Sequence, residues 1–137
     1  MKYLLDTNAC IGLLNERPAC IRTRFDEVLS QGSEVFASPI VVFELWYGVA
    51  KSQRRDTNAR FLAGFLSGPV QQLSFDEEDA RFSGELRAAM ETIGRPVGDY
   101  DLLIAGQALH HRMTLVTANV KEFGRVKGLV WEDWSKS

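Results

Sequence analysis

Short β-rich runs alternate with longer helical stretches along the whole chain, and this alternation most constrains the fold. The runs at residues 3–5, 34–37, 70–73 and 114–117 are typical of buried strands, and residues 129–131 have the same character. Strands separated by helices favour parallel pairing in one sheet that is covered by helices on both faces. We therefore expect an α/β fold with a central, mostly parallel sheet.

Capping residues, glycines and prolines mark the helices between these runs. Ser38-Pro39 places an N-cap residue before a proline at the first helical position, and Asp76 caps a long helical pattern. In that pattern Phe82, Leu86, Ala89, Met90 and Ile93 recur at helical spacing. The expected helices span residues 8–16, 18–31, 39–52, 55–67, 76–93 and 100–112.

Bulk properties narrow the class of protein further. A chain of 137 residues predicts a single domain over residues 1–137, and a net charge of −2 excludes a uniformly basic nucleic-acid coat. The two cysteines, Cys10 and Cys20, do not make a disulfide framework. Asp6 interrupts the first apolar run too early for a signal peptide, and no run approaches the roughly 20 residues of a membrane span. We expect a cytoplasmic protein.

An acid, a hydroxyl and an amide follow the first strand directly, as Asp6, Thr7 and Asn8. In parallel sheets, ligands bind beyond the carboxyl ends of the strands, which is where these side chains would lie. Asp is also a preferred helix N-cap, and Asp6 precedes a helical pattern. Taken alone, Asp6 fits either a capping residue or a functional carboxylate.

Glu44 lies on an apolar face of the helix expected over residues 39–52. Its neighbours one turn away include Val41 and Tyr47, and a carboxylate buried there without a partner would be costly. Gly48, also one turn away, lowers helix propensity by about 1 kcal/mol and leaves room for a ligand to approach. The alternative is a Glu that bends out to solvent or pairs with an Arg.

Two later segments supply further polar groups. Asp99 and Asp101 begin a helix two positions apart, so they face different directions, and Asp101 also fits as an ordinary stabilising acid of the first turn. Thr117 and Asn119 follow the strand at residues 114–117, and Glu122 comes three residues later. The latter group fits either a turn or a polar site at the same sheet edge as Asp6.

Three acids from distant segments would repel one another at this edge unless a cation compensates them. Oxygen ligands of this kind suit Mg²⁺ or Mn²⁺, which can activate water for phosphodiester hydrolysis. The sequence contains no HExxH, CxxC or GxxxxGK[ST] pattern, so zinc protease, zinc finger and P-loop functions lack support.

Several stretches, in this order, resemble a PIN-domain ribonuclease, and more narrowly a VapC toxin of a type II toxin–antitoxin pair. They are "LLDTNACI", "SPIVVFELWYGVAKS", "GRPVGDYDLLIAGQAL" and "LVTANVKEFGRVKGLVWEDW". The resemblance implies a three-layer α/β/α sandwich and metal-dependent cleavage of RNA. It also implies a homodimer, and a VapB-type antitoxin whose segment lies across the active-site groove.

By this resemblance, Asp6 and Asp101 stand where the family has its principal Mg²⁺ ligands, and Glu44 completes the cluster. The fourth acidic position of many PIN domains is Asn119 here, which leaves open whether one or two metals bind and makes Glu122 a possible substitute. Thr7, Asn8 and Thr117 are expected to support these groups. The final third is most similar to the VapC subgroup that cuts initiator tRNA in its anticodon loop.

RNA binding requires cations near the phosphates. The candidates are Lys51, Arg54, Arg55, Arg95, Arg112 and Lys121, although each also fits an ordinary solvated surface. We do not expect His110 and His111 to share a metal ion, because adjacent helical positions diverge. Five aromatic side chains either line the active-site groove or fill the core, and we expect most of them in the core: Phe43, Trp46, Tyr47, Phe61 and Phe65.

Two other classes of protein remain as alternatives. A phospho-receiver domain is also a small parallel α/β fold, but it needs a pair of acids after its first strand and a Lys at the end of a later strand. Here Asp6 stands alone after the first strand, and no such Lys follows the strand at residues 114–117. A non-catalytic PIN-like module that binds protein or RNA partners would keep the fold without the cleavage. Retention of Asp6, Glu44 and Asp101 favours the enzyme.

Overall fold

The computed structural model describes residues 1–136, whose strands form one five-stranded parallel sheet in the order β3-β2-β1-β4-β5. The strands are β1 (Lys2–Leu5), β2 (Glu34–Ala37), β3 (Gln71–Gln72), β4 (Thr114–Val116) and β5 (Trp131–Glu132). The expected parallel sheet is therefore confirmed. The outer strands β3 and β5 are shorter than the patterns at their positions suggest.

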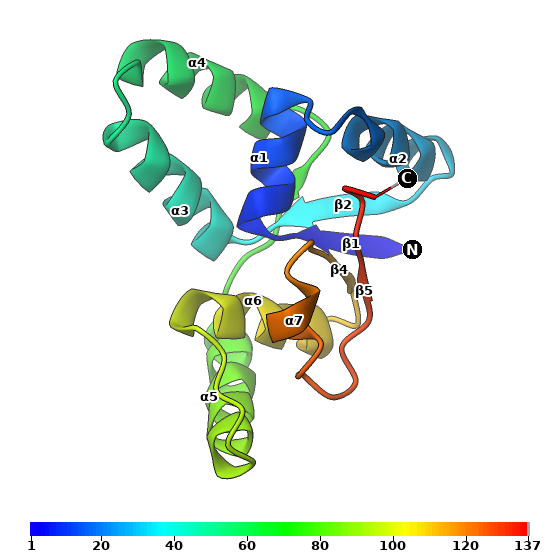
Figure 1. Cartoon of the computed structure of the whole chain (residues 1–137), viewed down its shortest axis with the longest axis vertical. Helices are drawn as coiled ribbons and strands as arrows, with labels where there is room; N and C mark the ends of the chain where they lie inside the picture. The colour runs from blue at the N-terminus through cyan, green and yellow to red at the C-terminus, as the bar shows by residue number, and fades with distance from the viewer. Residues whose placement is uncertain (137) are drawn as a thin grey trace.

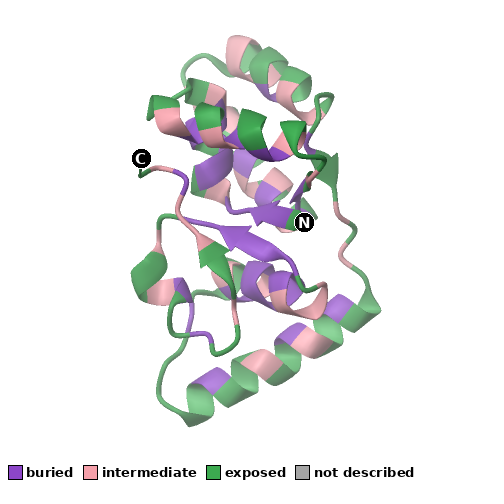
Figure 2. Ribbon diagram, turned by 90° about the vertical axis from the view of Figure 1, so that its right-hand side faces the viewer, coloured by how far each residue is buried: buried purple, intermediate pink, exposed green. Residues whose placement is uncertain are grey.

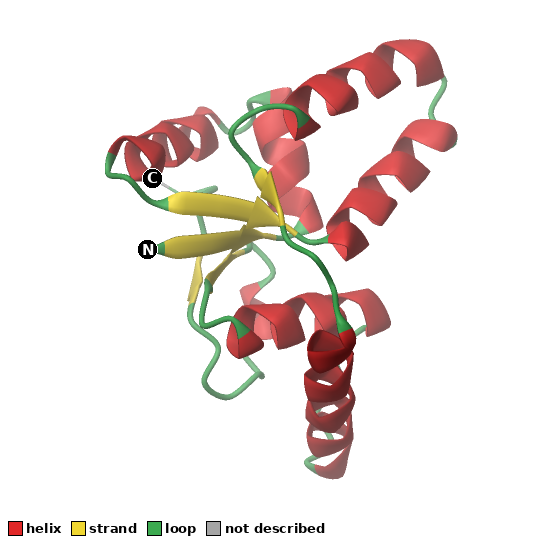
Figure 3. Cartoon of the chain, turned by 180° about the vertical axis from the view of Figure 1, so that it is seen from behind, coloured by secondary structure: helices red, strands yellow, loops and turns green. Residues whose placement is uncertain are grey.

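Helices cover both sides of the sheet. Figures 1 and 3 show α1–α4 on one side and α5–α7 on the other, which confirms the three-layer α/β/α class. The helices are α1 (Thr7–Asn15), α2 (Ala19–Ser30), α3 (Pro39–Ala50), α4 (Arg55–Leu66), α5 (Glu77–Thr92), α6 (Asp99–His110) and α7 (Val120–Phe123). The short helix α7 was not predicted. Within residues 1–136, none of the helices has the length and apolar content needed to cross a bilayer.

Strand register brings three polar residues to the same sheet edge. Leu5 pairs with Ala37 on one side and with Val116 on the other. The next residue of each strand is therefore Asp6, Ser38 or Thr117, and all three are buried. Because the strands are parallel, their carboxyl ends meet here, as expected for a ligand site in this class of fold.

The core lies along the three central strands β1, β2 and β4, which are buried almost throughout, whereas the outer strands β3 and β5 are largely exposed (Figure 2). Four of the aromatic side chains expected mainly in the core are instead exposed: Phe43, Trp46, Tyr47 and Phe61. Figure 1 shows α3 and α4 extending away from the sheet, and few residues of either helix are buried. The buried residues of these two helices are Val41, Leu45 and Leu62.

The long helix α5 packs against α6 through an interface that includes polar residues. Its buried positions are Asp79, Ser83 and Met90, whereas Ile93, expected on the apolar face, is exposed. Gly106 of α6 allows the two helices to approach closely, because a Cβ there would lie 2.3 Å from Ser83 Oγ and 3.3 Å from Ser83 Cα. A clash with backbone cannot be relieved by a side-chain rotation.

This close approach predicts opposite effects for two glycine substitutions. Gly106→Ala should lower the free energy of unfolding by about 1–3 kcal/mol, because the helices must separate. Gly84→Ala, on α5 where a Cβ meets nothing within 4 Å, should raise it by about 0.5–1 kcal/mol through helix propensity. Urea unfolding of both variants measures the difference, and equal effects would contradict the packing described.

Candidate active site at the carboxyl edge of the sheet

Asp6 connects the central strand β1 to helix α1 and is almost fully buried. Its Oδ1 accepts a 2.7 Å hydrogen bond from the Ala9 N–H, so the residue is itself the N-cap of α1. Burial is the main cause that raises its pKa, and the charges of Glu44 and Asp133 add to it, while hydrogen bonds from Thr117 and Ala9 oppose it. The capping and site interpretations of Asp6 are thus compatible.

Glu44 reaches the same edge from α3. Buried Ser38 caps that helix by accepting the Ile40 N–H at 3.1 Å, and Pro39 occupies the first position, as predicted. The Thr7 hydroxyl donates a 2.6 Å hydrogen bond to Glu44 Oε1. The half-buried carboxylate on this helix is therefore held by a residue adjacent to Asp6, and not by an Arg. Asn8, expected to support the site, lies exposed.

Asp101 lies in the first turn of α6, where burial and surrounding acids raise its pKa to about 6. The contributing charges are Glu122, Glu44 and Asp6, in decreasing order. Such coupling requires these four carboxylates, from distant parts of the chain, to lie close together. Asp99, two positions earlier, has an 80% exposed side chain and lies 3.8 Å from Arg87.

Glu122 of α7 closes the cluster beside Asp101. Its Oε1 accepts the Gly98 N–H at 2.7 Å, which ties α7 to the beginning of α6. Gly98 leaves room for this contact, because a Cβ there would lie 3.3 Å from Glu122 Oε1 and would press on the carboxylate. Asn119 donates its side-chain N–H to Glu122 Oε2 at 3.2 Å and its backbone N–H to the Thr117 hydroxyl at 3.0 Å. The carboxylate next to Asp101 is thus that of Glu122, with Asn119 orienting it.

Asp133 is a further acid at this edge, and sequence reasoning missed it. It follows β5, whose Glu132 pairs with Val116, and its charge raises the pKa of Asp6. Its Oδ1 accepts the Ser135 N–H at 2.9 Å. The strand predicted over residues 129–131 ends one residue before β5 does, which placed Glu132 and not Asp133 directly after it. With the observed bounds, Asp133 has the same relation to β5 as Asp6 has to β1.

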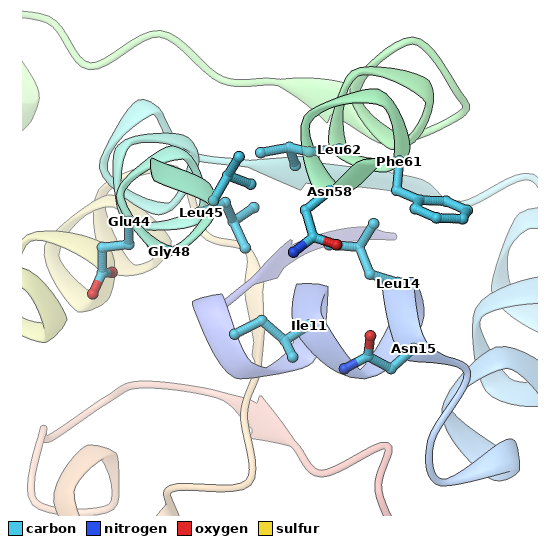
Figure 4. A pocket seen from close by; sticks show the side chains of 10 residues that line it. Ile11, Leu14, Asn15, Glu44, Leu45, Gly48, Asn58, Phe61 and Leu62 are labelled. Atoms are coloured by element: carbon cyan, nitrogen blue, oxygen red, sulfur yellow. The ribbon is translucent and has the colours of Figure 1, made fainter. Parts of the chain in front are cut away.

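A partly apolar pocket of about 450 Å³ lies between α1, α3 and α4, with Glu44 in its lining. Ile11, Leu14 and Phe61 supply apolar wall, and Phe61 is 68% exposed. Figure 4 shows the Glu44 carboxylate at one end, turned away from Leu14 and Phe61. The pocket therefore meets the carboxylate cluster at Glu44.

The predicted cations all lie on the surface. Lys51, Arg54, Arg55, Arg95, Arg112 and Lys121 are exposed. Lys51 Nζ lies 4.8 Å from the centroid of the Tyr47 ring, so that it is held near the aromatic surface of α3. Exposure leaves each of them available to phosphates, as it would any solvated side chain.

The donor set suits a hard divalent cation. Asp6, Glu44, Asp101 and Glu122 present carboxylate oxygens only, which favours Mg²⁺ or Mn²⁺ over the softer transition metals. The raised pKa of Asp101 reflects repulsion that such a cation would relieve. The side chains of this edge thus fit a metal-binding site that is partly pre-oriented by Thr7, Thr117 and Asn119.

Comparisons with known proteins agree with this geometry. Residues 3–129 match the family model described as PIN domain. The tRNA(fMet)-specific endonuclease VapC of Shigella flexneri is 42% identical over 135 residues, which cover 98% of this chain and 99% of that one. Ribonuclease VapC2 of Rickettsia felis is 39% identical, covering 99% of this chain and all of its own.

Comparison with solved structures also finds VapC relatives. The structure of VapBC2 from Rickettsia felis bound to a DNA fragment from its promoter superposes with a TM-score of 0.90 at 38% identity, covering 98% and 99% of the two chains. DNA-bound VapBC from Salmonella typhimurium gives 0.89 at 38% identity, covering 98% of each. Since both its sequence and its fold match over nearly the whole chain, this protein belongs to the PIN domain family and is a relative of its VapC members.

Proposed function

We propose that the chain is a single PIN domain that acts in the cytoplasm as the toxin of a type II toxin–antitoxin pair, by Mg²⁺-dependent cleavage of RNA. The observation that carries the proposal is the convergence of four acids at one sheet edge: Asp6, Glu44, Asp101 and Glu122. Together with burial, the charges of the other three raise the pKa of Asp101. The names of the VapC relatives, which are ribonucleases and endonucleases, support the reaction class.

Asp6, Asp101 and Glu44 are assigned to the metal, and Glu122 completes the set of acids. Bound Mg²⁺, with Mn²⁺ as a substitute, would supply charge neutralisation and an activated water for phosphodiester hydrolysis. The donor oxygens match that chemistry, and Mg²⁺ retains waters when only a few carboxylates bind it.

The surrounding residues act by orienting these carboxylates. The Ala9 N–H and the Thr117 hydroxyl hold Asp6 in place, and the Thr7 hydroxyl occupies Glu44 Oε1. We assign Glu44 Oε2 to the metal or to the attacking water. Carboxylates held in this way lose little conformational freedom when the ligand binds, which favours catalysis.

Initiator tRNA is the proposed substrate. The Shigella flexneri relative is named for tRNA(fMet), and the final third of the chain resembles the subgroup that cuts the anticodon loop. The exposed cations Lys51, Arg54, Arg55, Arg95, Arg112 and Lys121 are assigned to backbone phosphates, where they would supply affinity without sequence specificity.

A VapB-type antitoxin is the proposed protein partner, as in the VapBC complexes that this fold matches. The pocket between α1, α3 and α4 leads to Glu44, so a segment seated there would block the carboxylates. Exposed aromatic side chains beside the site, with Phe43 and Tyr100 5.6 Å apart edge to face, supply apolar area for a homodimer.

Two substitutions in the first turn of α6 test the metal–acid mechanism. Asp101→Asn should reduce cleavage of initiator tRNA by more than the roughly 10–100-fold typical of losing a residue that supports a metal ligand. Asp99→Asn, in the same turn but exposed, should retain activity. Rates are measured by gel on antitoxin-free protein with Mg²⁺ or EDTA.

Cleavage that survives EDTA or persists in Asp101→Asn would contradict the mechanism. An intact wild-type fold that cleaves no RNA would favour the alternative, a non-catalytic PIN-like module that acts by binding. Comparison with elongator tRNAs in the same assay tests the substrate separately from the chemistry.

Mg²⁺ affinity should depend on pH because protons compete with the metal for Asp101. With a pKa of about 6 in the metal-free protein, this carboxylate is largely ionised above about pH 7 and largely protonated below about pH 5. The apparent Kd for Mg²⁺ should therefore be constant at neutral pH and rise about tenfold per unit below about pH 6. Mg²⁺ titrations of cleavage at several pH values measure it, and a flat profile would contradict the assignment.

A further inference from the structure

A second group of metal-ligating side chains lies at the opposite end of α6 from Asp101. It consists of Asp79 near the beginning of α5 and of His110 and His111 at the end of α6. One ligand atom of each lies within 4.8 Å of those of the other two. Nine residues of helix, about 14 Å along its axis, separate His110 from Asp101, so this group is distinct from the carboxylate cluster.

The two histidines lie at the end of α6, and both turn toward acids of α5. His110 is the last residue of α6, and His111 is its C-cap with φ −91° and ψ 1°. Their rings lie 5.0 Å apart, edge to face. The expectation that adjacent helical positions keep these side chains apart was therefore wrong, since Asp79 and Glu78 of α5 draw both rings to the same side.

Asp79 is the fixed member of the group. It is fully buried, and its Oδ2 accepts hydrogen bonds from the Asp76 N–H at 3.0 Å and from Gln107 Nε2 at 3.4 Å. Its Oδ1 lies 2.8 Å from His111 Nε2. Despite the opposing effect of burial, these hydrogen bonds hold the pKa of Asp79 below its ordinary value, so the carboxylate is charged at neutral pH.

His110 and Glu78 lie on the side of this group that faces solvent. His110 Nε2 lies 3.7 Å from Glu78 Oε2, and the His110 ring packs 5.4 Å from that of Phe82. Both histidines keep 29% of their side chains exposed, so an ion has a path from solvent. The donors around a tetrahedral zinc lie about 3.3 Å apart. The separations of 2.8 Å between His111 and Asp79 and of 3.7 Å between His110 and Glu78 lie on either side of that value.

We propose that Asp79, His110 and His111 bind Zn²⁺, with Glu78 or a water as the fourth ligand. Two imidazoles and a carboxylate suit zinc, whereas the all-oxygen set at the other end of α6 suits Mg²⁺. Because the ligands come from α5 and α6, the ion would fasten the beginning of one helix to the end of the other. The proposal does not depend on the nuclease activity.

The chain offers a direct probe, since His110 and His111 are its only histidines. In untagged protein, the imidazole proton resonances therefore report on this group alone. One equivalent of Zn²⁺ should shift the ring resonances of both histidines and raise the Tm by roughly 5 °C. Ring resonances that stay unchanged at millimolar Zn²⁺, or a shift confined to one histidine, would overturn the proposal.

Two variants separate this site from the carboxylate cluster. His110→Gln, at a partly exposed position, should fold normally and weaken Zn²⁺ binding, read on the His111 ring, by at least about tenfold. Asp101→Asn removes an acid of the other site and should leave both ring shifts unchanged. An unaltered Kd in His110→Gln, or loss of the shifts in Asp101→Asn, would contradict a site made by these three residues.

Discussion

Parallel pairing of β1 with both β2 and β4 is the constraint on which the site depends. It places Asp6, Ser38 and Thr117 side by side where three strands end. From there each strand leads into an element that carries a functional group: Asp6 itself caps α1, Ser38 starts the helix of Glu44, and Thr117 precedes the turn of Asn119. A one-residue slip of either pairing would move Asp6 out of alignment and turn buried side chains toward the other face.

Residues whose placement follows from local rules were predictable from the sequence. Short stretches of sequence determine three of these placements: the helix start at Ser38-Pro39, the strand-end position of Asp6 and the first-turn position of Asp101. The partnership of Glu122 with Gly98 and Asp101 is different, because it joins segments more than 20 residues apart in sequence. Helix α6 and strand β4 lie between them, so the contact depends on how these two elements pack and not on a local pattern. For the same reason, Asp133 acquired significance only once β5 was paired with β4.

Exposure was the property least accessible to sequence patterns. Aromatic residues are usually buried, yet Phe43, Tyr47 and Phe61 are exposed on α3 and α4, two helices that project from the sheet. Conversely, Asp79 and Ser83 are buried because α5 packs tightly on α6. Helical periodicity tells which residues share a face, but which face is covered depends on helices from other parts of the chain. The α5–α6 interface also brings together side chains that the sequence leaves unconnected.

Asp6 caps α1 and, in the function proposed above, also binds the metal, which bears on natural variation at this position. The Ala9 N–H needs only an oxygen acceptor, and Asn, Ser and Thr offer one as well as Asp does. The cluster, by contrast, needs a negative charge. Drift among capping residues would therefore leave a protein that folds, keeps its surface and can engage its partners while the chemistry is lost. Such inactive variants of this protein would still bind the proposed antitoxin and so reduce the amount left to inhibit active copies.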